Sequence, residues 1–233
     1  MRIGTWNLDG KWEDAHRQVL LDQDCHIWLL TEVSPDAKDV QPLPGYQCHL
    51  SVGTMVDKLK QQRWAGILCR DTMKMEPMLP DPHAASAAAI IDGRTYCSTV
   101  LPWGNCKKDE PHPWVGDTVE KMSKHSIDAL MTTLKLPDTV WGGDWNQNLS
   151  GGWESVGSDD NRMLLNALID SLKFQVPTSG LLHTIKKQRD KTKTHAIDHI
   201  ALPWDWEVES IKRIAVPFSV SDHDAYVVEV EPR

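Results

Sequence analysis

The chain has 233 residues, of which 40% are hydrophobic and 25% charged, and its formal net charge is −8 at pH 7. This length and composition exclude a mainly disordered chain and indicate a globular protein with a sizeable core. The acidic balance argues against a surface coated with basic residues for non-specific binding to DNA, but it does not exclude a local phosphate site or a metal site built from carboxylates.

No linker rich in Gly, Ser or Pro divides the chain, so we expect a single domain over residues 1–233. The first ten residues, MRIGTWNLDG, lack the apolar core of a signal peptide, and no apolar run approaches the roughly 18 residues that span a bilayer. We therefore expect a cytoplasmic protein. The five cysteines are dispersed and never form a C-x-x-C pair, so neither a disulfide framework nor a zinc knuckle is predicted.

The first segments predict a strand, a helix and a second strand. Residues 2–8 (RIGTWNL) alternate apolar and polar side chains as a strand does. Residues 11–23 place their apolar side chains on one helical face. Residues 26–33 (HIWLLTEV) are apolar almost throughout, which is typical of a strand covered on both faces.

The next part of the chain is β-rich. Short apolar runs broken by Gly, Pro and Asp predict strands at residues 45–52, 63–70, 87–93 and 94–103. Asp92 and Gly93 are expected to form the turn of a hairpin between the last two strands.

The second half alternates helices and strands. Residues 117–134 predict a helix, and residues 138–144 predict a buried strand after it. A second helix over residues 159–174 is expected to be capped by Asp159 or Asp160. Three strands with Pro at their ends then follow at residues 195–203, 208–218 and 225–232. This arrangement is neither a strict βαβ repeat nor pure β, so it predicts two packed sheets with helices outside.

Polar side chains fall at or near the tips of five predicted strands. They are Asn7, Glu32, Asp144 with Asn146, Asp198, and Asp222 with His223. A single such residue means little, because Asp and Asn are ordinary turn formers. The whole set is harder to explain that way, since oxygen ligands from several strands are what Mg²⁺ or Mn²⁺ requires when it shares its shell with a substrate phosphate.

Five short motifs cover these positions: TWNLDG, LLTEV, GGDWNQN, AIDHIAL and SVSDHDAYVVEV. In this order they resemble the motifs of the endonuclease/exonuclease/phosphatase superfamily, the DNase-like fold that includes exonuclease III-type enzymes. The resemblance spans residues 5–230. It implies a four-layer α/β sandwich, in which two mostly antiparallel β-sheets pack face to face with helices outside. It also implies phosphoester hydrolysis that depends on a divalent metal.

The resemblance implies metal ligands among the matched residues. Glu32 would be the principal ligand, supported by Asn7, and Asp222 would bind the metal directly or through water. Asp9 matches an acid that lies near the metal in some exonuclease III-like members. A turn aspartate before Gly10 explains the same residue equally well.

The resemblance also implies four residues that carry the chemistry. Asp144 would orient or deprotonate the attacking water, and Asn146 would hold water or a phosphate oxygen. His223 would stabilise charge on the phosphate, while Asp198 fixes its tautomer and keeps it protonated. Phosphodiester hydrolysis needs these functions in any case, because the catalyst must neutralise charge, generate the nucleophile and place it in line.

One position departs from the family pattern. The strand TYCSTVLPWGN corresponds to one that usually brings a His or Tyr to the phosphate, and Val100 stands at that position. The usual donor is therefore missing, or it is replaced by Trp103 or Asn105 from the following loop. Trp6 and Trp145 flank the predicted ligands and are expected to wall the site.

The only dense basic run is KKQRDKTKTH, residues 186–195. A solvated hairpin is the default interpretation of such a run. Because the run ends just before the Asp198 strand, we favour a loop over the cleft, in which Lys186, Lys187 and Arg189 grip a nucleic-acid backbone.

Together these features predict a phosphodiesterase dependent on Mg²⁺ or Mn²⁺, and above all a nuclease that acts on DNA or RNA. Two alternatives stay open. One is a phosphatase or phosphodiesterase for a small or lipid-linked phosphate, of the inositol-phosphate or sphingomyelinase type. The other is a binding module without turnover. The sequence gives no indication of the oligomeric state.

Overall fold

The computed structural model describes residues 1–34, 43–52, 54–57, 60–104, 106, 112–150, 156–184 and 193–233. In chain order the elements are β1 (Arg2–Asn7), α1 (Asp14–Gln23), β2 (Ile27–Ser34), β3 (Tyr46–Leu50), β4 (Thr54–Asp57), β5 (Lys60–Arg70), β6 (Met75–Pro77), β7 (Ser86–Ile91), β8 (Arg94–Thr99), α2 (Val119–Leu134), β9 (Val140–Asp144), α3 (Asp159–Leu172), β10 (Phe174–Gln175), the 3₁₀ helix η1 (Pro177–Gly180), β11 (Leu182–Thr184), β12 (Lys193–His195), β13 (Asp198–Pro203), β14 (Glu207–Ile214) and β15 (Ala225–Glu231).

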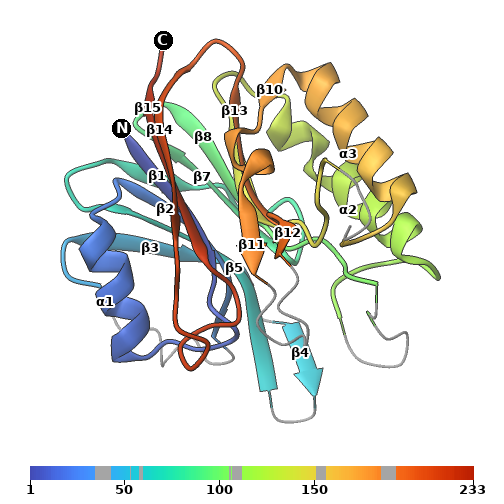
Figure 1. The fold of residues 1–233 in the computed structure, drawn as a ribbon, viewed down its shortest axis with the longest axis horizontal. Helices are drawn as coiled ribbons and strands as arrows, with labels where there is room; N and C mark the ends of the chain where they lie inside the picture. Colours follow the sequence, from blue (N-terminus) through green and yellow to red (C-terminus); the bar gives the residue numbers. More distant parts are fainter. Residues whose placement is uncertain are drawn as a thin grey trace.

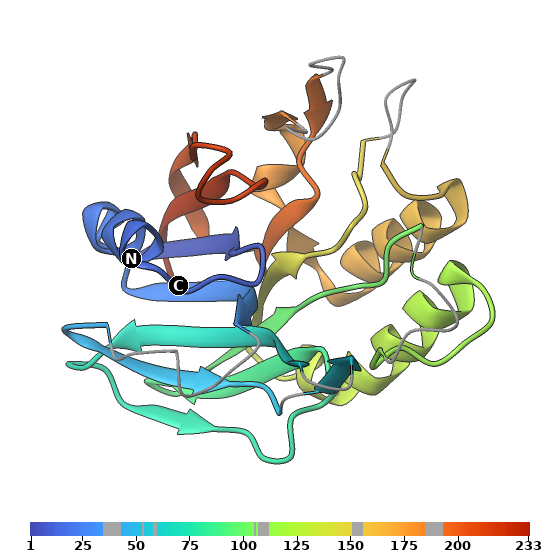
Figure 2. The same cartoon turned by 90° about the horizontal axis from the view of Figure 1, so that it is seen from below.

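Two β-sheets pack face to face between helices (Figures 1 and 2). The first sheet has the strand order β14-β15-β1-β2-β5-β3, with β4 paired to β5, and the second has the order β10-β13-β9-β8-β7-β6. Only the β1–β2 and β8–β9 pairs are parallel among the described strands. The predicted α/β sandwich of two mostly antiparallel sheets with helices outside is confirmed.

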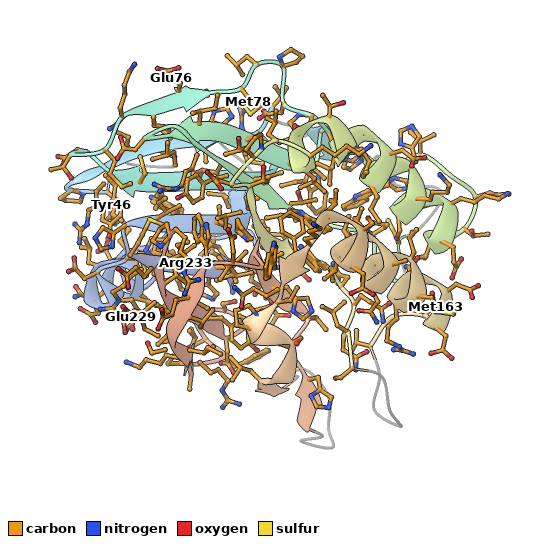
Figure 3. All side chains as sticks on the ribbon, turned by 90° about the horizontal axis from the view of Figure 1, so that it is seen from above. Tyr46, Glu76, Met78, Met163, Glu229 and Arg233 are labelled. Carbon is orange, nitrogen blue, oxygen red and sulfur yellow. The ribbon has the colours of Figure 1, made fainter. Side chains whose placement is uncertain are left out.

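Three apolar layers hold the sandwich together. Ile3, Ile67 and Val228 represent the fully buried layer between the two sheets. A second layer lies between the first sheet and α1, and a third lies between the second sheet and the pair α2 and α3. Burying apolar side chains on both faces of each sheet requires strands that are apolar almost throughout, as the run 26–33 predicts. Figure 3 shows the sandwich from above, with Tyr46 of β3 and Met163 of α3 on opposite sides of the molecule.

The two long helices begin at side-chain caps. The Thr118 hydroxyl accepts the Lys121 N–H at the start of α2, and the Ser158 hydroxyl accepts the Asn161 N–H at the start of α3. The prediction that Asp159 or Asp160 caps α3 is therefore wrong. Both aspartates lie in the first helical turn, where their charge suits the positive end of the helix dipole, and Ser158 has the extended backbone of a cap residue.

The predicted hairpin at Asp92-Gly93 is confirmed, with Ile91 paired to Arg94 and both turn residues at positive φ, 47° and 83°. The sequence patterns miss the short strands β4, β6, β10, β11 and β12, which have too few residues to display a period. Within the described ranges, the structure contains no helix with the length and apolar character that crossing a membrane requires.

Candidate active site

The strand directions bring the predicted site residues to one end of both sheets. Parallel β1 and β2 end side by side, with Asn7 opposite Thr31 in the register. In the second sheet β9 ends where antiparallel β13 begins, so that Asp144 and Asp198 are register partners. The loop before β15 carries Asp222 and His223 to the same place. Five separate segments thus meet at one site.

Asn7 connects the two sheets at the centre of this site. Its Nδ2 donates to Glu32 Oε1 at 3.0 Å and to Asp144 Oδ2 at 2.9 Å. Its Oδ1 accepts the Asp9 N–H at 2.9 Å. One buried amide therefore fixes the separation of two carboxylates that would otherwise repel each other. The hydrogen bond from Nδ2 to Glu32 Oε1 is the contact through which Asn7 would hold the Glu32 carboxylate in place.

Glu32 is turned into the site by an irregularity at the end of β2. The β2–β5 register shifts between Thr31 and Ser34, and Glu32 has φ of 46°, in the left-handed region that non-glycine residues seldom adopt. Burial raises the pKa of the Glu32 carboxyl, and the nearby acids Asp222 and Asp9 add to the rise against the hydrogen bond from Asn7. A strained acid that is costly to ionise is typical of a functional position.

The two glycines before Asp144 allow the close packing that places it. Gly143 has φ of +126°, and a Cβ there would lie 2.2 Å from the Thr99 carbonyl oxygen. A Cβ on Gly142 would lie 2.7 Å from Leu29 Cδ1 of the opposing sheet. Side chains at these positions would push β9 away from β8 and from the first sheet. The sequence GGD therefore lets Asp144 reach Asn7.

Asp144 and Asn146 form a short turn beyond β9. The Asp144 Oδ1 accepts the Asn146 N–H at 2.9 Å, and the Asn146 Nδ2 donates to the Leu101 carbonyl at 2.9 Å. Asn146 has φ of 51°, which Asn tolerates better than most residues. Burial first, and then the neighbouring Asp198 carboxylate, raise the pKa of Asp144 to about 7.

His223 and Asp198 form a dyad facing Asp144. The His223 Nδ1 lies 2.7 Å from Asp198 Oδ2, and its Nε2 lies 3.9 Å from Asp144 Oδ2 and 4.0 Å from Asp222 Oδ1. Burial opposes the charged imidazolium, but the surrounding carboxylates, Asp198 above all, outweigh it and raise the pKa of His223 well above its usual range. This geometry supports the predicted pairing of Asp198 with a protonated His223.

The loop that carries His223 is pinned to β1. The Ser221 hydroxyl donates to the Asn7 carbonyl at 2.8 Å and accepts the His223 N–H at 3.0 Å. The Trp6 Nε1 donates to the His223 carbonyl at 3.3 Å. Trp6 thus supports the loop from the layer under α1, where its ring is fully buried.

The expectation that Trp145 walls the site is wrong. Trp145 is 1% exposed and stacks on Trp141, with ring centroids 3.9 Å apart, in the core under α2 and α3. The two rings share a face because residues at even spacing in an extended chain point the same way. Trp145 holds the Asp144 turn from the helix side.

Val100 is fully buried and contributes to a cluster of apolar side chains that includes Trp64 and Trp114. The position at which the family pattern has a donor is therefore apolar here. Trp103 packs against the same cluster and is partly exposed. The other predicted substrate contacts, Asn105, Lys186, Lys187 and Arg189, lie outside the described residues. The last three lie between β11 and β12 in the sequence, and these two paired strands stand out from the sandwich in Figure 2.

Asp9 has features of a turn aspartate and also of an acid that lies near the metal site. Its φ of 54° and its position before Gly10 fit a turn aspartate, while its charge raises the pKa of Glu32. Its carboxylate pairs with the Lys11 ammonium at 2.8 Å. The sequence patterns miss Lys11, a cation beside the site, because a lone lysine before a helix carries no motif.

The donor chemistry fits a hard divalent cation. Ligand atoms of Asp144, Asp198 and His223 lie within 4.8 Å of one another, and the buried Asp198 Oδ1 has no hydrogen-bond partner in the described structure. Because the His223 ring nitrogens face carboxylates and favour a proton, the carboxylate oxygens are the better ligands for such an ion. Glu32 and Asp222 add oxygens to the same site, and the raised pKa of Glu32 reflects a repulsion that a cation would relieve.

Comparisons with solved structures identify proteins with the same fold. The endonuclease domain of TRAS1, a telomere-specific non-LTR retrotransposon, matches with a TM-score of 0.70 at 15% identity, covering 100% of this chain and 99% of that one. An endonuclease/exonuclease/phosphatase family protein from Leptotrichia buccalis matches with a TM-score of 0.64 at 16% identity, with 99% of each chain covered. A mannosyl-6-phosphatase from Bacteroides thetaiotaomicron matches with a TM-score of 0.60 at 12% identity, again with 99% of each chain covered.

No protein-family model matches the sequence, and no curated protein matches it. The structural matches show that the chain has the fold of the endonuclease/exonuclease/phosphatase superfamily.

Proposed function

We propose that this protein is a member of that superfamily and a metal-dependent phosphodiesterase, most specifically a nuclease that uses Mg²⁺ or Mn²⁺. One observation carries the proposal: Asn7 joins the carboxylates of Glu32 and Asp144 across the two sheets, opposite the Asp198–His223 dyad. A core that only needed stability would not gather these acids at one end, because burying charges that repel one another costs free energy.

The roles of the acids follow from their surroundings. Glu32 and Asp222, with Asp9 near them, would hold the cation, and Asn7 keeps Glu32 in place. When bound, the cation neutralises phosphate charge and lowers the pKa of a water molecule. Asp144 accepts a proton from the attacking water, a task for which a pKa near neutrality is favourable. Asn146 orients that water or a phosphate oxygen.

His223 supplies positive charge to the phosphate. Nδ1 is directed at Asp198, which keeps the ring protonated and oriented, and Nε2 faces the Asp144 and Asp222 carboxylates, so we assign the Nε2–H to a phosphate oxygen bound between them. Val100 offers no second donor. Charge stabilisation on that side of the phosphate therefore depends more heavily on His223 than it would with a His or Tyr at position 100.

Nucleic acid is the substrate that the surroundings of the site favour. The segment between β11 and β12 contains four of the five Lys and Arg residues of the basic run, and β12 ends three residues before Asp198. Basic side chains so close in sequence to the dyad suit a polyanionic backbone. Among the structural neighbours, the TRAS1 domain is described as an endonuclease.

A small phosphoester is the second candidate. The net charge of −8 gives limited general attraction for a polyanion, and the Bacteroides thetaiotaomicron neighbour is described as a mannosyl-6-phosphatase. The deciding experiment incubates the protein with single- and double-stranded DNA, RNA, a sugar phosphate and a generic phosphodiester, with Mg²⁺, Mn²⁺ or EDTA. We expect cleavage of nucleic acid that EDTA abolishes. Hydrolysis of the small esters alone would replace the nuclease proposal with the second candidate.

A further inference from the structure

Three tryptophans from distant segments pack together beside the site. The ring centroids of Trp64 and Trp114 lie 4.8 Å apart, and those of Trp103 and Trp114 lie 5.2 Å apart with the planes at 83°. Trp64 and Trp114 are buried, at 6% and 2% exposure, whereas Trp103 is partly exposed. Trp103 is therefore held from behind by two buried rings and keeps part of its surface open to solvent.

The cluster adjoins the site through β8. Trp114 Nε1 donates to the Val100 carbonyl at 3.2 Å, which anchors the cluster at the end of that strand. The next residue, Leu101, donates its N–H to the Asp144 carbonyl at 2.9 Å and accepts the Asn146 Nδ2 at 2.9 Å. Trp103 follows two residues later, so it lies close to the turn that carries Asp144 and Asn146.

The cluster also adjoins the site through the first sheet. Trp64 lies on β5 between Arg63 and Ala65. Their partners on β2 are Ser34 and Thr31, the two residues between which the register shifts at Glu32. The cluster is thus carried by the strand that pairs with the Glu32 segment on one sheet and by the chain that bonds the Asp144 turn on the other.

We propose that Trp103 stacks on an unpaired nucleobase adjacent to the phosphate that the site processes, so that the substrate class is single-stranded or locally unpaired nucleic acid. This inference rests on the proposed function. A base within a duplex has its faces covered by its neighbours, whereas an unpaired base can place a face against an indole. Bracing by Trp114 reduces the side-chain freedom that Trp103 loses on binding.

Stacking also compensates for two features of this chain. Its acidic net charge gives little of the phosphate attraction on which non-specific nucleic-acid binding normally depends. Val100, which is fully buried, offers no side-chain hydrogen-bond donor to the substrate. An aromatic surface provides affinity that depends on neither charge nor a donor.

The test is a double-mutant cycle on the full chain with Mg²⁺ or Mn²⁺. Cleavage of a single-stranded oligonucleotide is compared with cleavage of the same oligonucleotide carrying an abasic spacer next to the cleaved phosphate. The variants are Trp103→Ala, Trp103→Leu, which keeps an apolar side chain without an aromatic face, and Trp103→Phe, which keeps an aromatic face. Trp204→Ala is the matched control, because Trp204 is 65% exposed and lines a separate pocket with Leu136 and Lys173 at the far end of β13.

We expect Trp103→Ala and Trp103→Leu to lower kcat/KM about 10-fold or more on the intact oligonucleotide, mainly through KM, and to have little effect on the abasic one. Trp103→Phe should retain most of the activity. An equal loss on both substrates would overturn the stacking proposal while the nuclease function stood. Equal activity of the wild-type protein on intact and abasic strands would overturn it as well. Absence of nucleic-acid cleavage by the wild-type protein would refute the proposed function itself, and the inference with it.

Discussion

The Asp198 carboxylate lies 2.7 Å from Nδ1 of His223, while Nε2 of the same ring faces Asp144 at 3.9 Å. Asp198 is fully buried, so its charge is poorly screened by solvent and acts mainly on the imidazole. The pair therefore fixes both the orientation and the protonation of the His223 ring. Removing the Asp198 carboxylate should consequently have a specific kinetic effect.

Asp198→Asn should lower kcat by about 10²–10⁴-fold, by analogy with other acid–histidine pairs. Since Asp198 is the main source of the raised pKa of His223, that pKa should fall in the variant. If activity requires protonated His223, the alkaline limb of the pH profile must then move to lower pH. Steady-state kinetics across pH measure both effects, with Asp160→Asn on the exposed face of α3 as control. A variant with reduced kcat and an unmoved alkaline limb would contradict the assigned role.

Glu32→Gln and Asp144→Asn should separate metal binding from turnover. Glu32→Gln should weaken Mn²⁺ binding by about 10-fold or more, because it removes a charged oxygen ligand. Asp144→Asn should abolish turnover while Mn²⁺ still binds. Calorimetric titration with Mn²⁺ and an activity assay give the two readouts, and Glu76→Gln on the exposed strand β6 is the control. Full activity in either variant would refute the corresponding role.

Val100→His should not supply the missing donor. Val100 is fully buried among Trp64, Ala85 and Trp114, so an imidazole there would bring a larger and polar ring into a tightly packed apolar cluster. We expect a loss of about 2–4 kcal/mol in the free energy of unfolding, from overpacking and from burying a polar ring. Urea unfolding measures it, with Val100→Ile as an apolar control. A stable variant with increased activity would show instead that position 100 faces the substrate.

Acid should destabilise the protein through His83, which lies before β7 and whose ring packs edge-on to His125 of α2. Burial, with a smaller effect of His125, lowers the pKa of His83 to about 4, against about 6.5 in the unfolded chain. Between these values the unfolded state binds a proton that the folded state does not, so stability falls as the pH falls. The stabilisation is complete above the unfolded pKa and is lost toward pH 4, by at most about 3 kcal/mol.

His83→Asn tests this directly, because the Asn Oδ1 can replace the His83 Nδ1 that accepts the Ala85 N–H at 3.0 Å. Chemical unfolding of both proteins from about pH 7 to about pH 4 should show a steeper loss of stability in the wild type. Parallel pH dependences of the two proteins would exclude His83 as the cause.

The sequence predicts the fold and most of the site because both depend on local patterns. Long strands show their burial directly, as the apolar run ending at Glu32 does. Motifs at strand ends locate Asn7, Asp144 and His223 one by one, and the family resemblance brings them together. The structure confirms that they meet.

The features that the sequence misses depend on contacts between distant segments. Trp145 directly follows Asp144 in the chain, yet its side chain packs under α2 and α3. Consecutive side chains of an extended chain point to opposite faces, so Trp145 points away from the site. Trp64, Trp103 and Trp114 form one cluster only because β5, the end of β8 and the approach to α2 meet in space. Capping by Ser158 depends on its extended backbone conformation, which residue type alone does not determine.

The most direct test of the central claim is cleavage of a single-stranded oligonucleotide by the wild-type protein and by Asp144→Asn, each with Mg²⁺, with Mn²⁺, and after EDTA treatment followed by restored metal. We predict that the wild-type protein cleaves only with a divalent ion and regains activity when the ion is restored, and that Asp144→Asn remains inactive throughout. Cleavage that persists in EDTA, or that survives in Asp144→Asn, would contradict a metal-dependent phosphodiesterase centred on Asp144.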